Sequence, residues 1–211
     1  ALKHFKDAYP SCELTKEDIF YYIYGLLHNE EYRERYADNL TKQLPRIPRV
    51  KSFDDFKAFS YAGRQLADLH LNYESADMYT EAKLTGKTKG LKLTKQAIVG
   101  GVDEDYRVTK MKFSKKDDKS TVVYNSGITI ENIPEQAYDY VVNGKPALEW
   151  VMERQAVTTD KKSGITNDAN DWAIETMENA KYPLELFLRV ITVSLETQKI
   201  VNALPKLDIL N

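Results

Sequence analysis

Apolar residues recur with a helical period through the first third of the chain. In residues 15–28 they fall on one face of a helix, and Thr15 with Asp18 is a near match to a capping box at its start. A second helix, rich in charge, is predicted over residues 30–44, and a third over residues 52–69. We therefore expect the first part of the chain to be helical.

The period changes to that of a strand in the middle of the chain. Residues 106–113 alternate between apolar and polar side chains, and residues 120–124 and 128–133 form two further predicted strands. Residues 115–119 and 125–127 are predicted to be the turns between them. The three strands are expected to form an antiparallel meander.

The other segments are assigned from prolines and turn residues. Helices are predicted from Pro134 through Val142, from Pro146 through Met152, and from Tyr182 to a point before Pro205. Residues 1–11 are expected to be a polar linker or the end of an element. Residues 158–171 are expected to be a polar loop, and residues 77–101 a loop with room for one short strand.

Together these elements predict an α+β fold with a helical N-terminal part, a small antiparallel β-meander in the middle and a helical C-terminal part. The pattern changes near Tyr73. We therefore expect a helical subdomain over residues 1–75 and an α+β part over residues 76–211.

The composition of the 211 residues, 42% hydrophobic and 29% charged, is ordinary for a soluble domain. No apolar run approaches the roughly 18–20 residues that cross a bilayer, and no secretory signal begins the chain. Cys12 is the only cysteine, so no intrachain disulfide can form, and a cytoplasmic location without a membrane partner is expected. The polar start at Ala1 leads us to expect a piece of a longer protein.

The formal net charge of −2 hides an uneven distribution. Residues 83–119 contain eleven basic and five acidic side chains, whereas residues 13–38 contain seven acidic and three basic ones. A basic middle favours a polyanionic ligand to a modest degree, because most charge runs are solvated faces.

Phosphate-binding and metal-binding motifs are incomplete. Gly86-Lys87-Thr88 matches only the end of a phosphate-binding loop, and no dinucleotide fingerprint or adenine-methyltransferase motif is present. The histidines His4, His28 and His70 lack ligand spacing and are expected to be structural. We expect no cofactor and no metal in this chain.

Two strings resemble fragments of a metal-dependent nuclease core. They are Glu81-Ala82-Lys83, and Asp118-Lys119 after Asp103. Neither lies on a clear buried strand, and acid-x-lysine strings arise by chance in any charged chain. The chain is therefore expected to be non-catalytic, with a hidden nuclease as the least favoured hypothesis.

A basic hairpin is the main candidate for binding phosphate. Lys110 and Lys112 lie two apart on a predicted strand, so their side chains share a face. Lys115, Lys116 and Lys119 follow in the predicted turn. Such a hairpin can grip a nucleic-acid backbone, but lysines on a solvated strand edge also prevent edge-to-edge pairing. Charge alone leaves both interpretations open.

Two further groups complete the candidate set. An extended proline segment carries basic side chains, and loop asparagines can recognise the edge of adenine, although they are more often turn residues. The predicted DNA-contacting residues are Arg46, Arg49, Lys51, Lys110, Lys112, Lys115, Lys116, Lys119, Asn125, Arg154, Lys161, Lys162 and Asn167. Asn170 is a further loop asparagine of this kind.

Several ordered blocks of the sequence resemble one known family. They are residues 18–28, 31–36, 44–48, 62–74, 130–134, 140–145, 148–154 and 170–172. This set covers nearly the whole chain and resembles the C-terminal specificity domain of Type ISP restriction-modification enzymes, often described as predicted helicases.

The resemblance implies a target-recognition domain that binds double-stranded DNA. The longer enzymes of this family join it to a nuclease, a helicase-like ATPase and an adenine N6-methyltransferase, which implies ATP, Mg²⁺ and S-adenosylmethionine for the parent. The other domains of the parent chain are then expected partners. An alternative hypothesis is a structural module that docks the methyltransferase or the motor and touches DNA only slightly.

Overall fold

The computed structural model describes residues 2–87 and 90–210 and confirms the α+β class. Thr88, in the incomplete phosphate-loop match, lies outside the described residues. The chain forms two compact units. The first contains Ala1–Asn72 and Thr197–Asn211, and the second contains Tyr73–Glu196.

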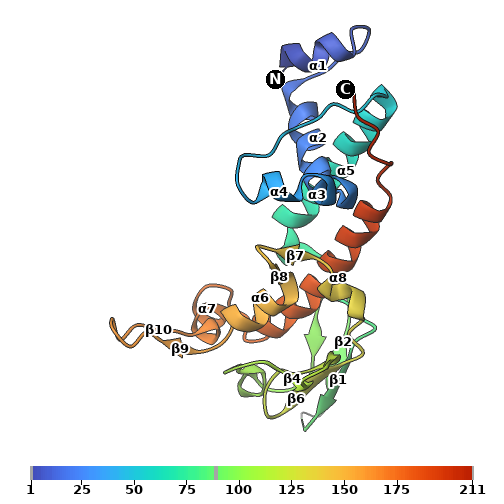
Figure 1. The fold of residues 1–211 in the computed structure, drawn as a ribbon. Helices are drawn as coiled ribbons and strands as arrows, with labels where there is room; N and C mark the ends of the chain where they lie inside the picture. The colour runs from blue at the N-terminus through green and yellow to red at the C-terminus, as the bar shows by residue number, and fades with distance from the viewer. Residues whose placement is uncertain (1, 88–89, 211) are drawn as a thin grey trace. The chain divides into compact units, whose positions relative to one another are not determined.

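The first unit is helical. Its elements are α1 (Leu2–Ala8), α2 (Lys16–His28), α3 (Glu30–Arg35), α4 (Ala37–Leu40) and α5 (Phe53–Leu71) (Figure 1). The expectation of a linker at the start is wrong, because α1 buries Phe5 in the core of this unit. The single helix predicted over residues 30–44 is interrupted at Tyr36, whose backbone leaves the helical region.

Side-chain caps start these helices where the sequence places them. Thr15 and Asp18 form a complete capping box, in which each side chain bonds the other residue's backbone N–H. Asn29 ends α2 and caps α3 by accepting from the Tyr32 N–H at 2.9 Å. Ser52 caps α5 in the same way.

Helices α2 and α5 pack closely because two glycines meet at their contact. A Cβ placed on Gly63 would lie 1.8 Å from the Tyr21 carbonyl oxygen, and one placed on Gly25 would lie 2.3 Å from that of Phe59. The two backbones therefore touch at a distance that only glycine permits.

Buried tyrosines tie the extended proline segment to this helical core. Tyr22 stacks on Phe56 with ring centres 4.8 Å apart and donates its hydroxyl to the Pro48 carbonyl at 2.7 Å. Tyr32 donates to the Arg46 carbonyl at 2.7 Å. Burial raises the pKa of both hydroxyls, so they remain protonated donors. The segment is thus fixed through its backbone.

The C-terminal segment returns to the first unit and pairs with that proline segment. Val50 and Ile209 form an antiparallel bridge, and the Leu210 N–H donates to the Arg49 carbonyl at 2.7 Å. The division predicted at residue 75 did not include this C-terminal segment in the first unit.

The second unit contains a four-stranded antiparallel sheet with the order β1-β6-β5-β4. Its strands are β1 (Lys83–Gly86), β4 (Lys112–Lys115), β5 (Asp118–Val123) and β6 (Ile128–Glu131). The predicted meander is present, but its first strand starts later than expected, because Asp103–Tyr106 forms the 3-10 helix η2. The predicted loop 77–101 supplies the edge strand β1.

Three small hairpins accompany the sheet. They pair β2 (Lys92–Leu93) with β3 (Ile98–Val99), β7 (Val141–Val142) with β8 (Lys145–Pro146), and β9 (Thr158–Thr159) with β10 (Thr166–Asn167). Two expectations are corrected by these pairs. The helix predicted over residues 134–142 is the 3-10 helix η3 (Glu135–Tyr138) followed by β7, and the predicted loop after residue 158 begins with an ordered hairpin.

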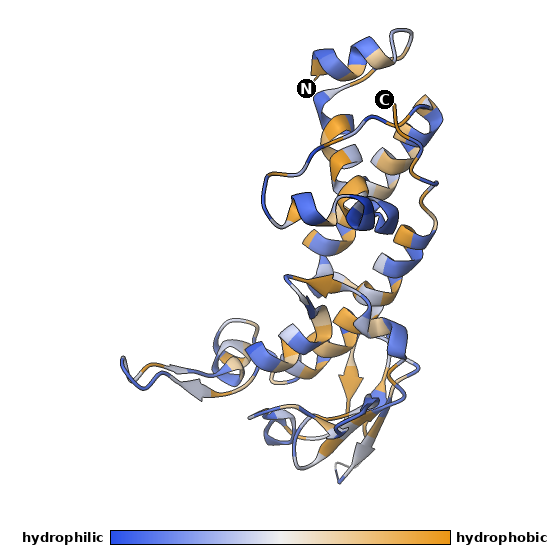
Figure 2. Cartoon of the chain, in the orientation of Figure 1, coloured by the Kyte–Doolittle hydropathy of each residue, from blue (hydrophilic) through white to orange (hydrophobic). Residues whose placement is uncertain are grey.

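Helices cover the hydrophobic core of this unit. The helices that contribute buried side chains to it are η2, η3, α6 (Ala147–Arg154) and the part of α8 (Tyr182–Asn202) that precedes Thr197. The unit also contains η1 (Tyr73–Ser75) and α7 (Ala169–Glu175). Leu148 of α6 and Phe187 of α8 are fully buried with Tyr124 and Ile130 of the sheet region. The hydropathy colouring follows this arrangement, with apolar residues along the helices and strands of the core (Figure 2).

None of the helices within residues 2–87 and 90–210 has the length and apolar character needed to cross a bilayer.

Candidate nucleic-acid interface

The proline segment carries three predicted contacts, and two of them are engaged within the first unit. The Arg49 guanidinium donates to the His4 carbonyl at 3.1 Å, and the Lys51 ammonium lies 2.8 Å from the Asp208 carboxylate. Arg46 is exposed, with only its carbonyl engaged by Tyr32. Sequence reasoning missed the internal partners because they lie in α1 and the C-terminal segment.

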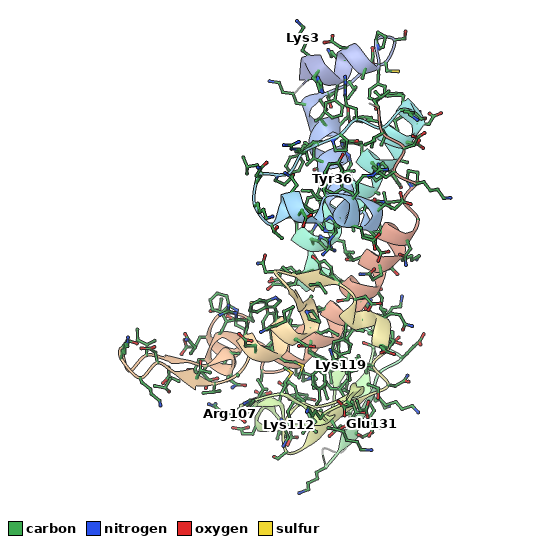
Figure 3. The ribbon with its side chains drawn as sticks, viewed as in Figure 1. Lys3, Tyr36, Arg107, Lys112, Lys119 and Glu131 are labelled. Atoms are coloured by element: carbon green, nitrogen blue, oxygen red, sulfur yellow. The ribbon has the colours of Figure 1, made fainter. Side chains whose placement is uncertain are left out.

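The hairpin of β4 and β5 presents the basic middle of the chain. Lys112 and Lys115 lie on β4, Lys116 lies in the turn, and all three are exposed (Figure 3 labels Lys112). A register shift lies between Phe113 and Lys115. Lys110 precedes the strand and is exposed, so it does not share a regular strand face with Lys112 as predicted.

Lys119 differs from its neighbours, because it lies on β5 and is neutralised inside the unit. Its ammonium is 2.8 Å from the Glu149 carboxylate of α6 and 5.2 Å from the centre of the Tyr138 ring. These contacts hold the side chain against α6 (Figure 3 labels Lys119). Its charge is therefore less available to an outside anion than that of Lys116.

Two of the loop asparagines are bonded within the chain. The Asn125 amide donates to the carbonyls of Asp105 and Arg107 and accepts from the Gly127 and Ile128 N–H groups, all at 2.8–2.9 Å. Asn170 is buried and bonds both backbone groups of Val108. The Asn125 amide has no donor or acceptor left for a base edge, and burial keeps the Asn170 amide away from one.

The hairpin of β9 and β10 carries the remaining asparagine and two lysines. Lys161 and Lys162 occupy its turn, Asn167 lies on β10, and all three are exposed. In the part of the chain that the structure describes, no salt bridge holds either lysine. These three side chains are therefore open to a ligand, as are Lys112, Lys115 and Lys116 of the β4–β5 hairpin.

Arg154 ends α6 and lies beside an aromatic ring. Its guanidinium carbon is 5.3 Å from the centre of the Trp150 ring, and the Lys145 ammonium is 4.3 Å from the same centre. The Trp150 indole donates to the Val142 carbonyl at 2.7 Å, which fixes the ring. Lys145 is itself paired with Glu153.

An open groove of about 530 Å³ lies between the start of β4 and α6. It is lined by Lys110, Lys145, Glu149 and Glu153 among apolar side chains such as Met111 and Phe113. Both signs of charge are present, so the groove has no preference for an anion as such.

A metal centre finds no support in the described residues, where no group of three or more histidine, cysteine or acidic side chains can hold an ion. The nuclease-like acid Asp118 accepts from the Ser120 hydroxyl and N–H, which lowers its pKa. His28 and His70, scattered in sequence, lie with ring centres 5.4 Å apart and also lack such a group.

The structure adds residues that the sequence analysis did not single out. Arg107 pairs with Asp168 at 2.6 Å beside the base of the β9–β10 hairpin, and Ile165 on that hairpin is 62% exposed. The sequence offered one signal for Ile165, because it is an isoleucine inside a run of polar residues.

The family described as the Type ISP C-terminal specificity domain matches residues 1–186. No curated protein matches the chain.

Solved structures give the same relationship. The chain is 44% identical to a nuclease-deletion mutant of the Type ISP restriction-modification enzyme LlaGI in complex with a DNA substrate mimic, with a TM-score of 0.78 over 93% of this chain and 14% of that one. It is 41% identical to the ATP-dependent Type ISP enzyme LlaBIII bound to DNA, with a TM-score of 0.79 over 94% of this chain and 12% of that one. A DrdV–DNA complex is 32% identical, with a TM-score of 0.74 over 97% of this chain and 19% of that one. The chain thus spans less than a fifth of these proteins.

Proposed function

The chain belongs to the family of Type ISP C-terminal specificity domains, and from this premise we propose that it binds duplex DNA and recognises a target sequence for a single-chain restriction-modification enzyme. Such a parent joins it to a nuclease, a helicase-like ATPase and an adenine N6-methyltransferase. ATP, Mg²⁺ and S-adenosylmethionine belong to those parts. This chain contributes binding and no catalytic group.

The observation that carries the proposal is the exposure of lysines at two hairpin turns. Lys115 and Lys116 on one hairpin and Lys161 and Lys162 on the other are exposed. Within residues 2–87 and 90–210 no salt bridge neutralises them. Exposed ammonium groups that no salt bridge holds are suited to phosphate contacts, which fix the register of a protein on DNA.

The remaining predicted contacts take lesser parts in this proposal. Lys110, Lys112 and Arg154 supply further charge on the second unit, and Arg46 supplies it on the first. The other candidates are engaged inside the chain and contribute little to DNA binding. They are Arg49, Lys51, Lys119 and Asn125.

A salt series tests the proposal. The chain is titrated onto a labelled duplex that contains a randomised centre, in gel-shift assays at several ionic strengths. Binding should weaken steeply with salt, because each phosphate contact releases condensed cations and contributes about −0.9 to the slope of log K against log salt. Absence of duplex binding at low salt would contradict it.

A second candidate function is docking of another domain of the parent. Phe20 on α2 and Tyr61 on α5 are 61% and 65% exposed, and aromatic side chains are enriched at protein–protein interfaces. In the full-length enzyme, Phe20→Ser with Tyr61→Ser should then loosen protection of α2 and α5 from hydrogen exchange. If the exchange is unchanged, this face docks nothing.

A further inference from the structure

The β9–β10 hairpin is an ordered element without a core of its own. Every side chain from Thr158 to Asn167 is exposed. The hairpin extends away from α6 and α7 within the second unit (Figure 1), and its turn is hydrophilic (Figure 2). An isolated two-stranded hairpin is marginally stable in water, so its retention without buried side chains points to a role outside the fold.

Local hydrogen bonds hold the hairpin in one shape. The Asp160 carboxylate accepts from the Lys162 and Ser163 N–H groups at 3.0 and 2.7 Å, which closes the turn. Gly164 completes it at φ +72°, and the Asp160 N–H donates to the Ile165 carbonyl at 2.9 Å. The hairpin is therefore preformed.

The base of the hairpin is anchored to the body of the unit. Asp168 follows β10 directly and pairs with Arg107, and Asn170, two residues further on, is bonded to the backbone of Val108. The hairpin is thus presented from a fixed point, as a recognition element requires.

Its two faces differ in their free hydrogen-bonding groups. On one face the Thr159 and Thr166 hydroxyls bond each other at 2.8 Å. Ile165 directly precedes β10, and its carbonyl accepts from the Asp160 N–H at 2.9 Å, which continues the antiparallel pairing of β9 with β10 by one residue. Alternation along this paired segment places Ile165 with Asn167 on the other face. That face carries an exposed aliphatic group and an exposed amide two positions apart.

This face matches the chemistry of an adenine–thymine pair in the major groove. The groove admits a two-stranded β-ribbon, an asparagine amide can bond adenine N6 and N7, and an aliphatic side chain can contact the thymine methyl group. Lys161 and Lys162 at the turn add positive charge for the flanking phosphates.

We infer that the β9–β10 hairpin enters the major groove and reads base edges, with Asn167 recognising an adenine and Ile165 the methyl group of a thymine. This inference rests on the proposed DNA-binding function and names the element that supplies its specificity.

The experiment selects preferred sequences from a pool of duplexes with a randomised centre, using the purified chain and its Asn167→Ala and Ile165→Ala variants. The wild-type consensus should contain an adenine whose preference falls roughly tenfold or more in Asn167→Ala, with binding to other sequences unchanged. Replacing the consensus thymine by uracil, which lacks the methyl group, should weaken wild-type binding roughly threefold to fourfold. The same replacement should leave Ile165→Ala unaffected.

Matched controls come from other exposed positions. Asn202→Ala and Ile174→Ala remove an exposed asparagine and a 57% exposed isoleucine outside the hairpin, and both should keep the wild-type consensus. DNA binding whose base preferences survive in both hairpin variants overturns this inference alone. Wild-type binding without any base preference overturns this inference together with the proposed recognition of a target sequence. Absence of duplex binding by the wild type overturns the proposed function as well.

Discussion

The side-chain amide of Asn170 bonds both backbone groups of Val108, as a neighbouring strand would in a sheet. Its amide accepts from the Val108 N–H at 2.8 Å and donates to the Val108 carbonyl at 2.7 Å. Val108 and Asn170 are both buried, so no water can take over these bonds freely. This pairing joins the start of α7 to the segment before β4 and fixes the base of the β9–β10 hairpin.

Loss of this pairing should cost more stability than loss of an exposed asparagine. Asn170→Ala leaves two buried backbone groups unsatisfied and is expected to lower the free energy of unfolding by about 2–4 kcal/mol. Asn167→Ala should change it by less than about 0.5 kcal/mol, because its side chain is exposed. Urea denaturation followed by circular dichroism measures both, and equal effects would contradict the structural role of Asn170.

The close contact of α2 and α5 predicts that Gly63 cannot be replaced. In Gly63→Ala the new methyl group would meet the Tyr21 carbonyl, so the helices must separate, at a cost of about 3 kcal/mol or more. The exposed Ala58 of the same helix serves as a control, and Ala58→Val should cost less than about 1 kcal/mol. Thermal denaturation compares the two variants. A Gly63→Ala protein as stable as the control would refute the backbone contact.

The two kinds of lysine on the β4–β5 hairpin should behave differently. Lys115→Glu with Lys116→Glu is expected to weaken binding to all duplexes alike and to flatten the salt dependence, because phosphate contacts carry no sequence information. Lys119→Gln should affect DNA affinity less, since Glu149 already neutralises that ammonium. Gel shifts at several salt concentrations measure the slopes, and equal losses in the two proteins would count against this distinction.

Burial of two histidines predicts a loss of stability in mild acid. Desolvation lowers the pKa of His70 to about 4, with a smaller contribution from His28, and the pKa of His28 is lowered as well. His70 bonds the hydroxyls of Tyr24 and Thr197, both at 2.8 Å. The unfolded chain therefore binds protons from about pH 6.5 downward while the folded chain does not.

The stabilisation from neutral His70 is complete above pH 6.5 and should be lost as the pH falls toward about 4. Each histidine can contribute a slope of at most about 1.4 kcal/mol per pH unit. Urea denaturation between pH 7 and pH 5 measures how the free energy of unfolding depends on pH, in a range above that in which most carboxylates titrate. His70→Gln should flatten the dependence, and a wild-type stability that is constant over this range would disprove it.

Local signals predicted the parts of the fold that local bonds determine. The Thr15–Asp18 capping box and the cap at Ser52 depend on residues within one turn, and each helix begins where the sequence places it. The strand predicted over residues 120–124, which is β5 (Asp118–Val123), the turn at Asn125 and the strand from Ile128 likewise follow from alternation and turn chemistry. The turn predicted over residues 115–119 is shorter, because Lys115 still belongs to β4 and Asp118 already belongs to β5. The β9–β10 hairpin escaped prediction because its two-residue strands are too short for a period to appear.

The sequence by itself therefore determined the α+β class, the main helices, the meander and, through ordered blocks of residues, the family of this protein. Tertiary structure alone decided which charges and amides remain free for a ligand. Lys119 is neutralised by Glu149, thirty residues away, and Asn170 is bonded to Val108, whereas Lys162 and Asn167 stay exposed. Such pairings form only when segments that are distant in the sequence come together in the folded chain. The pattern of neighbouring residues does not predict which segments these are.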